Sequence, residues 1–383
     1  MLQRSPRATT RLGDNRLGDR RRSDRPRSRR RTRHLLTALG TTALVGCTTM
    51  AVVAPAASAS TKAAKAAKAT KAAKSTKAAT PNLSGVTITF ADQFKEYQTI
   101  LTAANALAGA QYTVNWQEFV GGPPIIAAET GGSVDLGDMA ETPTIFAQAA
   151  GDPVKVVAAT LSANPKVSPF DLVVPASSSV KKLSQLKGQT IGVQEGTVEQ
   201  YVLIQILKKA GIPYSGVTIE NLSVVNAATA VASGKVAAAL ISQPLTAIDL
   251  AAGKIRVLTT GAGYTQTIGY LTASQAALDN PQKAAAIADF VQRFYKAEAF
   301  VKKNPQLAIN SYVKIYGVTE AEAKEAAATV VEAATPITPA IISYQQTEAN
   351  TFLKLGLITK QLNVKGVFDL PLNSSIDAKA GLK

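Results

Sequence analysis

The segment that most constrains the fold of this chain runs from residue 116 to 150 and alternates strand-like with helix-like runs. Residues 113–120 are rich in β-branched and aromatic side chains, which favour a strand. Pro123 and Pro124 suit the first turn of a helix, where backbone N–H groups have no partner within the helix. Residues 134–137 form a short run typical of a buried strand. We therefore expect a strand, a helix and a second strand in succession.

A second helix start follows directly. Glu141 and Thr142 precede Pro143, which indicates a helix cap and a proline in the first turn. Residues 154–159 predict a third apolar strand. Strands that alternate with helices of this length pair in parallel, and such sheets bind ligands outside the carboxyl ends of their strands. Because helix N-termini at this edge would point free N–H groups outward, we expect a cleft for a small molecule.

The second half of the chain repeats this pattern, which predicts a second lobe. Strand-like runs at residues 190–193, 217–222 and 236–241 alternate with helix-like runs that begin at Val198 and at about Asn226. The runs GGSVDL and SGKVAAAL mark equivalent helix-to-strand corners in the two halves. We therefore expect two similar lobes around a cleft.

The last part of the chain is predicted to be helical. Asn280 before Pro281 indicates an N-cap, and Thr319 with Glu322 indicates a capping box. The last predicted helix covers residues 340–355, and the tail beyond it is expected to be extended. We expect these helices to pack on the first lobe, which requires the chain to cross between the lobes twice.

The expected fold class is therefore α/β with two lobes, each a mainly parallel sheet flanked by helices, and a cleft between the lobes. We place the crossings near residues 169–175 and 262–271. Lobe I would comprise residues 81–172 and 268–383, and lobe II residues 173–267.

The charge of the chain is concentrated at its N-terminus. The formal net charge is +16, and all of this excess lies in residues 1–80, because residues 81–383 carry equal numbers of acidic and basic side chains. A nucleic-acid-binding protein needs a basic face to neutralise phosphates. The neutral body of the chain therefore argues against a nucleic-acid partner.

Residues 1–59 are expected to be an export signal. An Arg-rich run precedes an apolar stretch at residues 35–45, which is too short for a comfortable membrane span. The sequence LVGC ending at Cys47 resembles a bacterial lipobox, in which this cysteine is lipidated. The sequence ASA ending at Ala59 instead predicts ordinary signal-peptidase cleavage. Both alternatives remain open here, so the protein is expected on the outer face of the cytoplasmic membrane, lipid-anchored, or secreted or cell-wall associated.

A Lys/Ala-rich linker at residues 60–80 separates the signal from the body. Its lysines recur at every third position from Lys62 to Lys77, so on a helix they would spiral around the axis rather than form one face. The segment is expected to be a solvated tether. The alternative is electrostatic contact with anionic lipid headgroups or wall polymer.

Residues 81–383 contain neither cysteine nor histidine, since the only cysteine is Cys47 and the only histidine is His34. This composition excludes disulfides, thiolate or imidazole metal sites, and Cys or His catalysis from the body. Asp135, Asp138 and Glu141 are not expected to form a metal site, because strand alternation sends the first two to opposite or solvent-facing sides. We expect no cofactor, no bound metal and no enzymatic activity.

From about residue 86 onwards, the sequence resembles the periplasmic-type substrate-binding proteins of ABC importers for aliphatic sulfonates, taurine and nitrate. The resemblance is carried by NWQEFVGGPPIIAAETGGSVDLGDMAETPTIFAQAAG, LKGQTIGVQEGT, ASGKVAAALISQP and LGLI. It implies a type II binding protein, expected to be monomeric, that closes over a small-molecule ligand by hinge bending and delivers it to a membrane permease. The same family is similar to a wider group that takes up thiamine-precursor pyrimidines and includes a few enzymes.

The resemblance also implies where the ligand binds. By position, the implied cleft residues are Asp92, Gln93, Phe94, Glu141, Thr142, Pro143, Thr160, Ser162, Glu195, Gly196, Thr197, Gln243 and Pro244. Tyr264 is a further candidate, which either packs at the second crossing or lines the cleft.

Some of these residues also have a purely structural interpretation. A carboxylate at a helix start is favourable without any ligand, so Glu141 is either a cap or a ligand contact. Thr142 and Thr197 are either plain N-caps or hydroxyls that help to hold an oxyanion. The chain also departs from the family pattern, because Ala140-Glu141 stands where a Gly-Asp pair is usual and Ala237 where an Asp is usual.

The resemblance favours an aliphatic sulfonate as the ligand. The candidate site, however, contains Asp92, Glu141 and Glu195, which would repel an anion unless they cap helices. A zwitterion such as taurine would relieve this conflict. The remaining alternative is a nitrogenous metabolite such as a thiamine-precursor pyrimidine.

Overall fold

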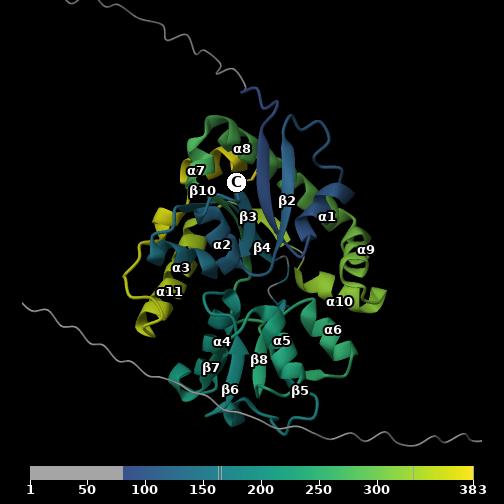
Figure 1. Ribbon diagram of the computed structural model, residues 1–383, viewed down its shortest axis with the longest axis vertical. Helices are drawn as coiled ribbons and strands as arrows, with labels where there is room; N and C mark the ends of the chain where they lie inside the picture. The colour runs from purple at the N-terminus through teal and green to yellow at the C-terminus, as the bar shows by residue number, and fades with distance from the viewer. Residues whose placement is uncertain (1–80, 163, 165, 331, 383) are drawn as a thin grey trace, which may run out of the picture. The chain divides into compact units, whose positions relative to one another are not determined.

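The computed structural model describes residues 81–162, 164, 166–330 and 332–382. Its strands form two sheets, and each sheet is flanked by helices (Figure 1). Sheet A has six strands in the order β11-β4-β10-β3-β1-β2, and sheet B has five in the order β7-β6-β8-β5-β9. The export signal and the Lys/Ala-rich linker lie outside the described residues.

Sheet A forms the core of the first lobe. Its strands are β1 (Thr87–Gln93), β2 (Thr113–Phe119), β3 (Leu136–Ala140), β4 (Val154–Ser162), β10 (Ile268–Ser274) and β11 (Glu332–Thr335). β1 pairs in parallel with β2 and β3, whereas β10 is antiparallel to both β3 and β4, and β11 is antiparallel to β4.

Sheet B forms the core of the second lobe. Its strands are β5 (Phe170–Pro175), β6 (Thr190–Val193), β7 (Thr218–Asn221), β8 (Ala238–Ser242) and β9 (Ile255–Thr260). β6 is parallel to β7 and β8, and β5 is antiparallel to β8 and β9.

The two-lobed α/β class is confirmed, but both sheets are mixed rather than mainly parallel. The mixed pairing follows from the two points at which the chain crosses between the sheets. The chain leaves sheet A at the end of β4 and enters sheet B as β5, then leaves after β9 and re-enters sheet A as β10. Each entering strand starts at the edge where the parallel strands end, so it has to run antiparallel to them. The predicted lobe boundary after residue 172 falls within β5, and the predicted second crossing overlaps the start of β10.

Each lobe has its own helices (Figure 1). With sheet B are α4 (Val198–Lys209), α5 (Val224–Ala232) and α6 (Leu245–Ala251), and the short 3-10 turns η1 (Leu183–Leu186) and η2 (Tyr214–Gly216). The first lobe contains α1 (Glu96–Ala103), α2 (Gly122–Thr130), α3 (Thr142–Ala150), α7 (Gln275–Asp279), α8 (Pro281–Lys303), α9 (Pro305–Tyr316), α10 (Glu320–Val330), α11 (Pro339–Lys354), η3 (Val364–Val367) and α12 (Leu370–Ala380).

The main core of the first lobe forms between α8 and sheet A. The Asn280 side chain caps α8 by accepting from the N–H groups of Gln282 and Lys283, which confirms the predicted start of this helix. Phe290 on α8 is fully buried and lies 5.1 Å, centroid to centroid, from the ring of Phe90 on β1. The aromatic and aliphatic face of α8 therefore holds the helix on the sheet through apolar burial.

The C-terminal tail was expected to be extended, and this expectation is wrong. The Asp369 side chain accepts from the N–H of Leu372 and starts α12, whose Ile376 is buried in the same core as α8. The apolar residues of α12 do not recur at a clear 3.6-residue period, so the sequence pattern does not indicate a helix there.

None of the helices in the described part of the chain is both long enough and apolar enough to cross a membrane.

Candidate functional site

A cleft of about 140 Å³ lies where the carboxyl ends of strands from the two sheets face each other. Both lobes contribute to its walls. The lining residues are Gln93, Phe94, Glu96, Gly121, Gly122, Ala140, Pro143, Pro169 and Phe170, together with Gln194, Thr197, Val198, Glu199, Val224, Ser242 and Gln243. We call this space the inter-lobe cleft.

Helix N-termini from both lobes open onto the inter-lobe cleft. Gly121 precedes α2, Pro143 lies in the first turn of α3, and Thr197 precedes α4. Val224 begins α5 on the same wall. Helix starts carry a partial positive charge and unsatisfied N–H groups, so this wall is suited to an anionic group.

The two lobes lie close to each other at Gly121. Its backbone has φ 84°, and a Cβ there would lie 2.8 Å from the side-chain oxygen of Gln194 on the other lobe. The Gly121 N–H donates to Oε1 of Gln93 across 2.9 Å. The backbone conformation therefore requires a glycine here, and a larger residue would also displace the end of the Gln194 side chain.

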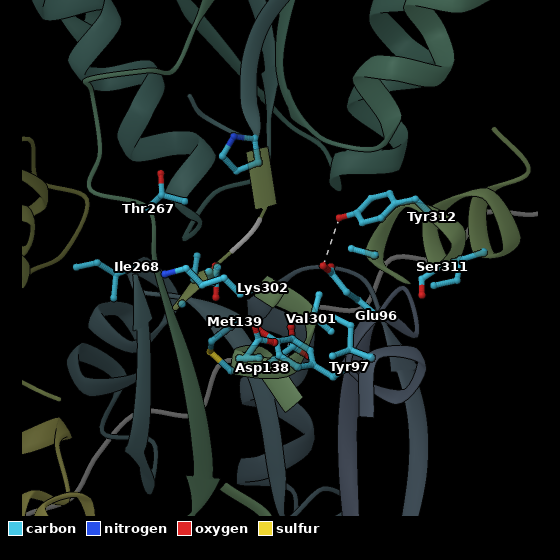
Figure 2. A pocket seen from close by; sticks show the side chains of 18 of the residues that line it. Glu96, Tyr97, Asp138, Met139, Thr267, Ile268, Val301, Lys302, Ser311 and Tyr312 are labelled. Atoms are coloured by element: carbon cyan, nitrogen blue, oxygen red, sulfur yellow. Dashed lines mark hydrogen bonds between the residues drawn. The ribbon is translucent and has the colours of Figure 1, made fainter. Parts of the chain in front are cut away.

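A second cavity, of about 150 Å³, adjoins the inter-lobe cleft on the side of lobe I. The two spaces share Glu96, Ala140, Pro169 and Phe170 in their linings. We call the second space the acid pocket, because five acidic residues line it: Glu96, Asp138, Glu141, Glu298 and Glu332. Figure 2 labels two of them, Glu96 and Asp138.

The acidic residues of the acid pocket come from five parts of the fold, and Glu141, at the start of α3, is described below. Glu96 begins α1 and accepts a hydrogen bond of 3.3 Å from the Tyr312 hydroxyl of α9, as Figure 2 shows. Asp138 on β3 accepts from the backbone N–H and side-chain amide of Gln93, at 3.0 and 3.3 Å. Glu332 on the edge strand β11 accepts from the Thr160 hydroxyl, and Glu298 lies on α8.

Burial in one small space shifts the pKa of these carboxyl groups upward. Desolvation, followed by the charges of Glu332 and Asp92, raises the pKa of Glu96 to about 8. Desolvation also raises the pKa of Glu332 to about 7. Burial places the pKa values of Asp138 and Glu298 well above their usual range. Burial in the acid pocket therefore favours the protonated forms of these carboxyl groups.

Glu141 stands at the start of α3, but its side chain does not cap the helix. The residue is fully buried, and Oε1 accepts from the Thr265 hydroxyl at 2.9 Å. Oε2 is buried without a hydrogen-bond partner. Burial raises the pKa of this carboxyl to about 7. The alternative that Glu141 serves only as a helix cap therefore has no support in its contacts.

The structure brings six of the sequence-predicted residues to one of these two spaces. Gln93, Phe94, Pro143, Thr197 and Gln243 line the inter-lobe cleft, and Glu141 lines the acid pocket. The Thr197 hydroxyl donates to the Gln194 carbonyl at 2.7 Å rather than to a backbone N–H of α4. That these six residues contact a ligand is a proposal based on their positions in the two linings.

Several other predicted residues have structural partners nearby. Asp92 is 1% exposed and accepts from the N–H groups of Tyr97 and Gln98, at 3.0 and 2.7 Å, so it caps α1. The Thr142 hydroxyl donates to Glu348, and the Thr160 hydroxyl donates to Glu332. None of these three lines either space.

The remaining predicted residues also lie outside both linings. Ser162 donates to the Asn164 carbonyl, and the exposed Glu195 is hydrogen-bonded to Asn221. Gly196 donates its N–H to Gln200. Pro244 follows the lining residue Gln243, and Tyr264 packs on the core of lobe II with the Lys209 ammonium 5.0 Å from its ring centroid.

Sequence reasoning missed most of the acid pocket. Glu96, Glu298 and Glu332 were not singled out, because no spacing along the chain connects them. Asp138 was expected to face away from Asp135 or towards solvent, yet it is 6% exposed and lines the pocket. Among the described residues, no group of three or more Asp, Glu, His or Cys side chains is arranged to hold a metal ion.

Comparison with known proteins agrees with this architecture. The family described as NMT1/THI5 like matches residues 123–308. A protein of Escherichia coli strain K12, described by name as an aliphatic sulfonates-binding protein, is 27% identical over 256 residues, which cover 66% of this chain and 78% of that protein. The resemblance inferred from the sequence is thereby confirmed.

Solved structures show the same fold. The alkanesulfonate-binding protein SsuA from Xanthomonas axonopodis pv. citri, bound to MOPS, has a TM-score of 0.68 at 24% identity, covering 74% of this chain and 98% of that chain. The desulfurization enzyme DSZB has a TM-score of 0.56 at 11% identity, covering 77% and 99%. The periplasmic binding protein fold is therefore shared with both a binding protein and an enzyme.

Proposed function

We propose that this protein is the extracytoplasmic ligand-binding component of an ABC importer and that it captures a small organic sulfonate between its lobes. One observation carries the proposal. Helix N-termini from both lobes line a single cleft, in a fold shared with an alkanesulfonate-binding protein. The named relatives favour a sulfonate over the nitrogenous alternative.

The wall of the inter-lobe cleft has the chemistry that a sulfonate needs. A sulfonate offers three oxygen acceptors, and backbone N–H groups at helix starts together with the Gln243 side-chain amide can donate to them. The Thr197 hydroxyl becomes a further donor when it turns away from the Gln194 carbonyl. No arginine lines the cleft, so the anion would be held by dipoles and hydrogen bonds. Because the donors come from both lobes, ligand binding favours the closed arrangement of the lobes.

Delivery to a permease requires the protein to be outside the cytoplasm. Residues 1–59 supply the export signal in this proposal, with lipidation at Cys47 or cleavage after Ala59 as the alternatives. The intact mass of the mature protein distinguishes them. A chain that begins at a diacylated Cys47 supports lipid anchoring, and a chain that begins at Ser60 contradicts it.

Binding without chemical conversion is the activity that this composition supports. Residues 81–383 have no cysteine or histidine, so the cleft has neither a thiolate nor an imidazole for covalent or general-base catalysis. Recovery of every tested ligand unchanged after incubation supports a transport role. Conversion of a ligand would overturn it.

A thermal-shift screen tests the proposal. The purified protein is heated with alkanesulfonates, aminoalkanesulfonates, nitrate, pyrimidines and alkylamines. A ligand present at about 100 times its Kd adds about 2.7 kcal/mol to the free energy of unfolding, which raises Tm measurably. We expect stabilisation by at least one organic sulfonate. Stabilisation by pyrimidines or nitrate but by no sulfonate would contradict the proposal.

A further inference from the structure

A pair of buried carboxyl groups adjoins the first turn of α3. Glu141 and Glu348, which lies on α11, are both fully buried. The hydroxyl of Thr142, the residue next to Glu141, donates to Oε1 of Glu348. One turn earlier on α11, the side-chain amide of Gln345 donates to the Thr144 hydroxyl at 2.7 Å. A buried polar layer therefore joins α11 to the start of α3.

Each carboxyl group of this pair has one oxygen without a donor. Oε1 of Glu141 accepts from the Thr265 hydroxyl at 2.9 Å, and Oε1 of Glu348 accepts from Thr142. Oε2 of both residues is buried without a hydrogen-bond partner. None of the salt bridges in the described part of the chain includes either residue. Since a buried carboxylate needs donors or a cation to offset its lost hydration, two negative charges are strongly disfavoured in this layer.

The two carboxyl groups also act on each other. Desolvation, and then the charge of Glu141, holds the pKa of Glu348 well above its usual range. Desolvation raises the pKa of Glu141 to about 7. Carboxyl groups that interact in this way titrate in steps that belong to the pair rather than to either residue. The pair therefore favours states that keep at least one proton.

The pair lies within one turn of the helix start at which the sulfonate is proposed to bind. Thr142 and Pro143 are the first residues of α3, and Pro143 lines the inter-lobe cleft. A negative charge on the pair would oppose the partial positive charge that favours an anion at this helix start. We propose that Glu141 and Glu348 act as one proton-binding pair, and that a sulfonate bound at the start of α3 draws a proton from solvent onto it. This inference rests on the proposed function and adds a regulation of the same site by pH.

Sulfonate affinity should therefore fall as pH rises. A bound sulfonate is negative and favours the protonated pair, so the complex binds more protons than the free protein. Coupling between two sites is reciprocal, so protons strengthen sulfonate binding by the same free energy. A sulfonic acid stays ionised in this pH range, so the ligand itself exchanges no proton.

Other titratable or charged groups face the pair from the elements packed against it. They are Glu199 and Tyr201 on α4, Tyr270 on β10, Glu332 on β11 and Tyr344 on α11, and, around the acid pocket that Glu141 lines, Glu96, Tyr97, Asp138, Glu298, Lys302, Tyr312 and Tyr316. Burial raises the pKa values of Tyr201, Tyr270 and Tyr344, so these hydroxyls stay neutral. The other carboxyl groups can take up protons, so variants have to separate them from the pair.

Isothermal titration calorimetry on the purified protein tests the inference. The probes are the alkanesulfonates from methanesulfonate to hexanesulfonate. Titration in Tris and in bicine, two sulfonate-free buffers that differ in ionisation enthalpy, measures the protons exchanged on binding. We expect uptake of roughly half a proton per bound sulfonate at pH 8 and roughly tenfold weaker binding at pH 9 than at pH 6.

The double variant Glu141→Gln/Glu348→Gln assigns the proton to the pair. Both glutamines keep an oxygen acceptor and cannot ionise, so proton uptake should fall by at least about half. Glu129→Gln is the matched control, because Glu129 is 2% exposed, has a pKa raised to about 8 by burial, and lies outside both linings. This control should take up as many protons as the wild-type protein.

Two further measurements do not depend on the double variant. Glu141→Gln alone leaves Glu348 without a charged neighbour, so the pH at which affinity falls should shift. The same pH profile as wild type would overturn the pair. Infrared difference spectra of the wild-type protein should show that sulfonate binding strengthens the carbonyl band of protonated carboxyl groups at the expense of carboxylate bands. No such change would also overturn the inference.

The outcomes separate the two proposals. Sulfonate binding without proton uptake, or with equal uptake by the double variant and the wild-type protein, overturns this inference and leaves the proposed function standing. Failure of every alkanesulfonate to bind at both pH 6 and pH 9 overturns both.

Discussion

The Tyr312 hydroxyl lies 3.3 Å from Oε1 of Glu96 and joins α9 to α1 across the acid pocket. This hydrogen bond is made to a carboxyl group whose pKa is about 8, and it favours the charged form of that carboxyl. Burial and neighbouring carboxylates act in the opposite direction and dominate. The protonation of Glu96 at neutral pH is therefore set by a balance in which Tyr312 takes part.

Removal of this hydroxyl should raise the pKa of Glu96 further. Tyr312→Phe keeps the ring and removes the donor that favours the charged form of Glu96. The folded variant then keeps its proton to a higher pH, so we expect its Tm to fall more between pH 7 and pH 9 than the Tm of the wild-type protein. Thermal unfolding at the two pH values checks this. An equal fall in both proteins would contradict this role of the hydroxyl.

The inter-lobe cleft can be tested at Thr197. Thr197→Val removes the hydroxyl at nearly constant volume, so a sulfonate that draws this hydroxyl away from the Gln194 carbonyl would lose one donor. We expect the affinity for any bound sulfonate to fall by roughly tenfold, the effect of a hydrogen bond to a charged group. Thr229→Val, at an exposed position of α5, is the matched control and should bind as wild type. Unchanged affinity in both variants would place the sulfonate elsewhere.

The role assigned to Asp92 is structural. Its two carboxylate oxygens accept from the N–H groups of Tyr97 and Gln98, and Asn at this position can supply one oxygen acceptor only. Asp92→Asn should lower the free energy of unfolding by about 1 kcal/mol, as measured by denaturant titration. Asp279→Asn, at an exposed position of α7, should change it little. Full stability of the Asp92 variant would contradict the capping role.

The stability of the protein should fall as pH rises from about 5 to 8. Burial raises the pKa of Glu129 to about 8, from 4.5 for an ordinary carboxyl. The folded state therefore keeps a proton that the unfolded state has released, so each rise in pH within this window favours unfolding. Desolvation acts in the same direction on Glu96, Glu141 and Glu332.

The variant Glu129→Gln measures how much Glu129 contributes to this loss of stability as pH rises. Glu129 is 2% exposed and accepts from the Thr272 hydroxyl at 2.9 Å, away from both ligand spaces. The glutamine keeps an acceptor and cannot titrate, so the difference in Tm between pH 5 and pH 8 should become smaller than in the wild-type protein. The exposed Glu325→Gln should leave that difference as it is. The same slope in all three proteins would refute the assignment.

Local signals predicted much of the fold. The start of α8 could be inferred because Asn280 and Pro281 act within one turn, and the helix face of Phe290 follows the 3.6-residue period. The direction of β10 could not be inferred in this way, because it depends on the edge at which the chain re-enters sheet A. The helix α12 was missed because its apolar residues follow the 3.6-residue period only weakly.

Only part of the site was predicted, because local sequence signals mark helix starts but not residues that come together through folding. Pro143 and Thr197 mark helix starts that can be recognised in the sequence, and both line the inter-lobe cleft. Glu96, Glu298 and Glu332 lie on three elements far apart along the chain and meet only after the lobe has folded. Their pKa values are raised because folding buries them in one space, so no sequence pattern indicates the shift.

A crystal structure of the protein with an alkanesulfonate tests the account most directly. The account predicts one ligand between closed lobes, with its sulfonate beside the first residues of α2, α3 and α4. A sulfonate group in the acid pocket, or a ligand bound away from both spaces, would contradict it.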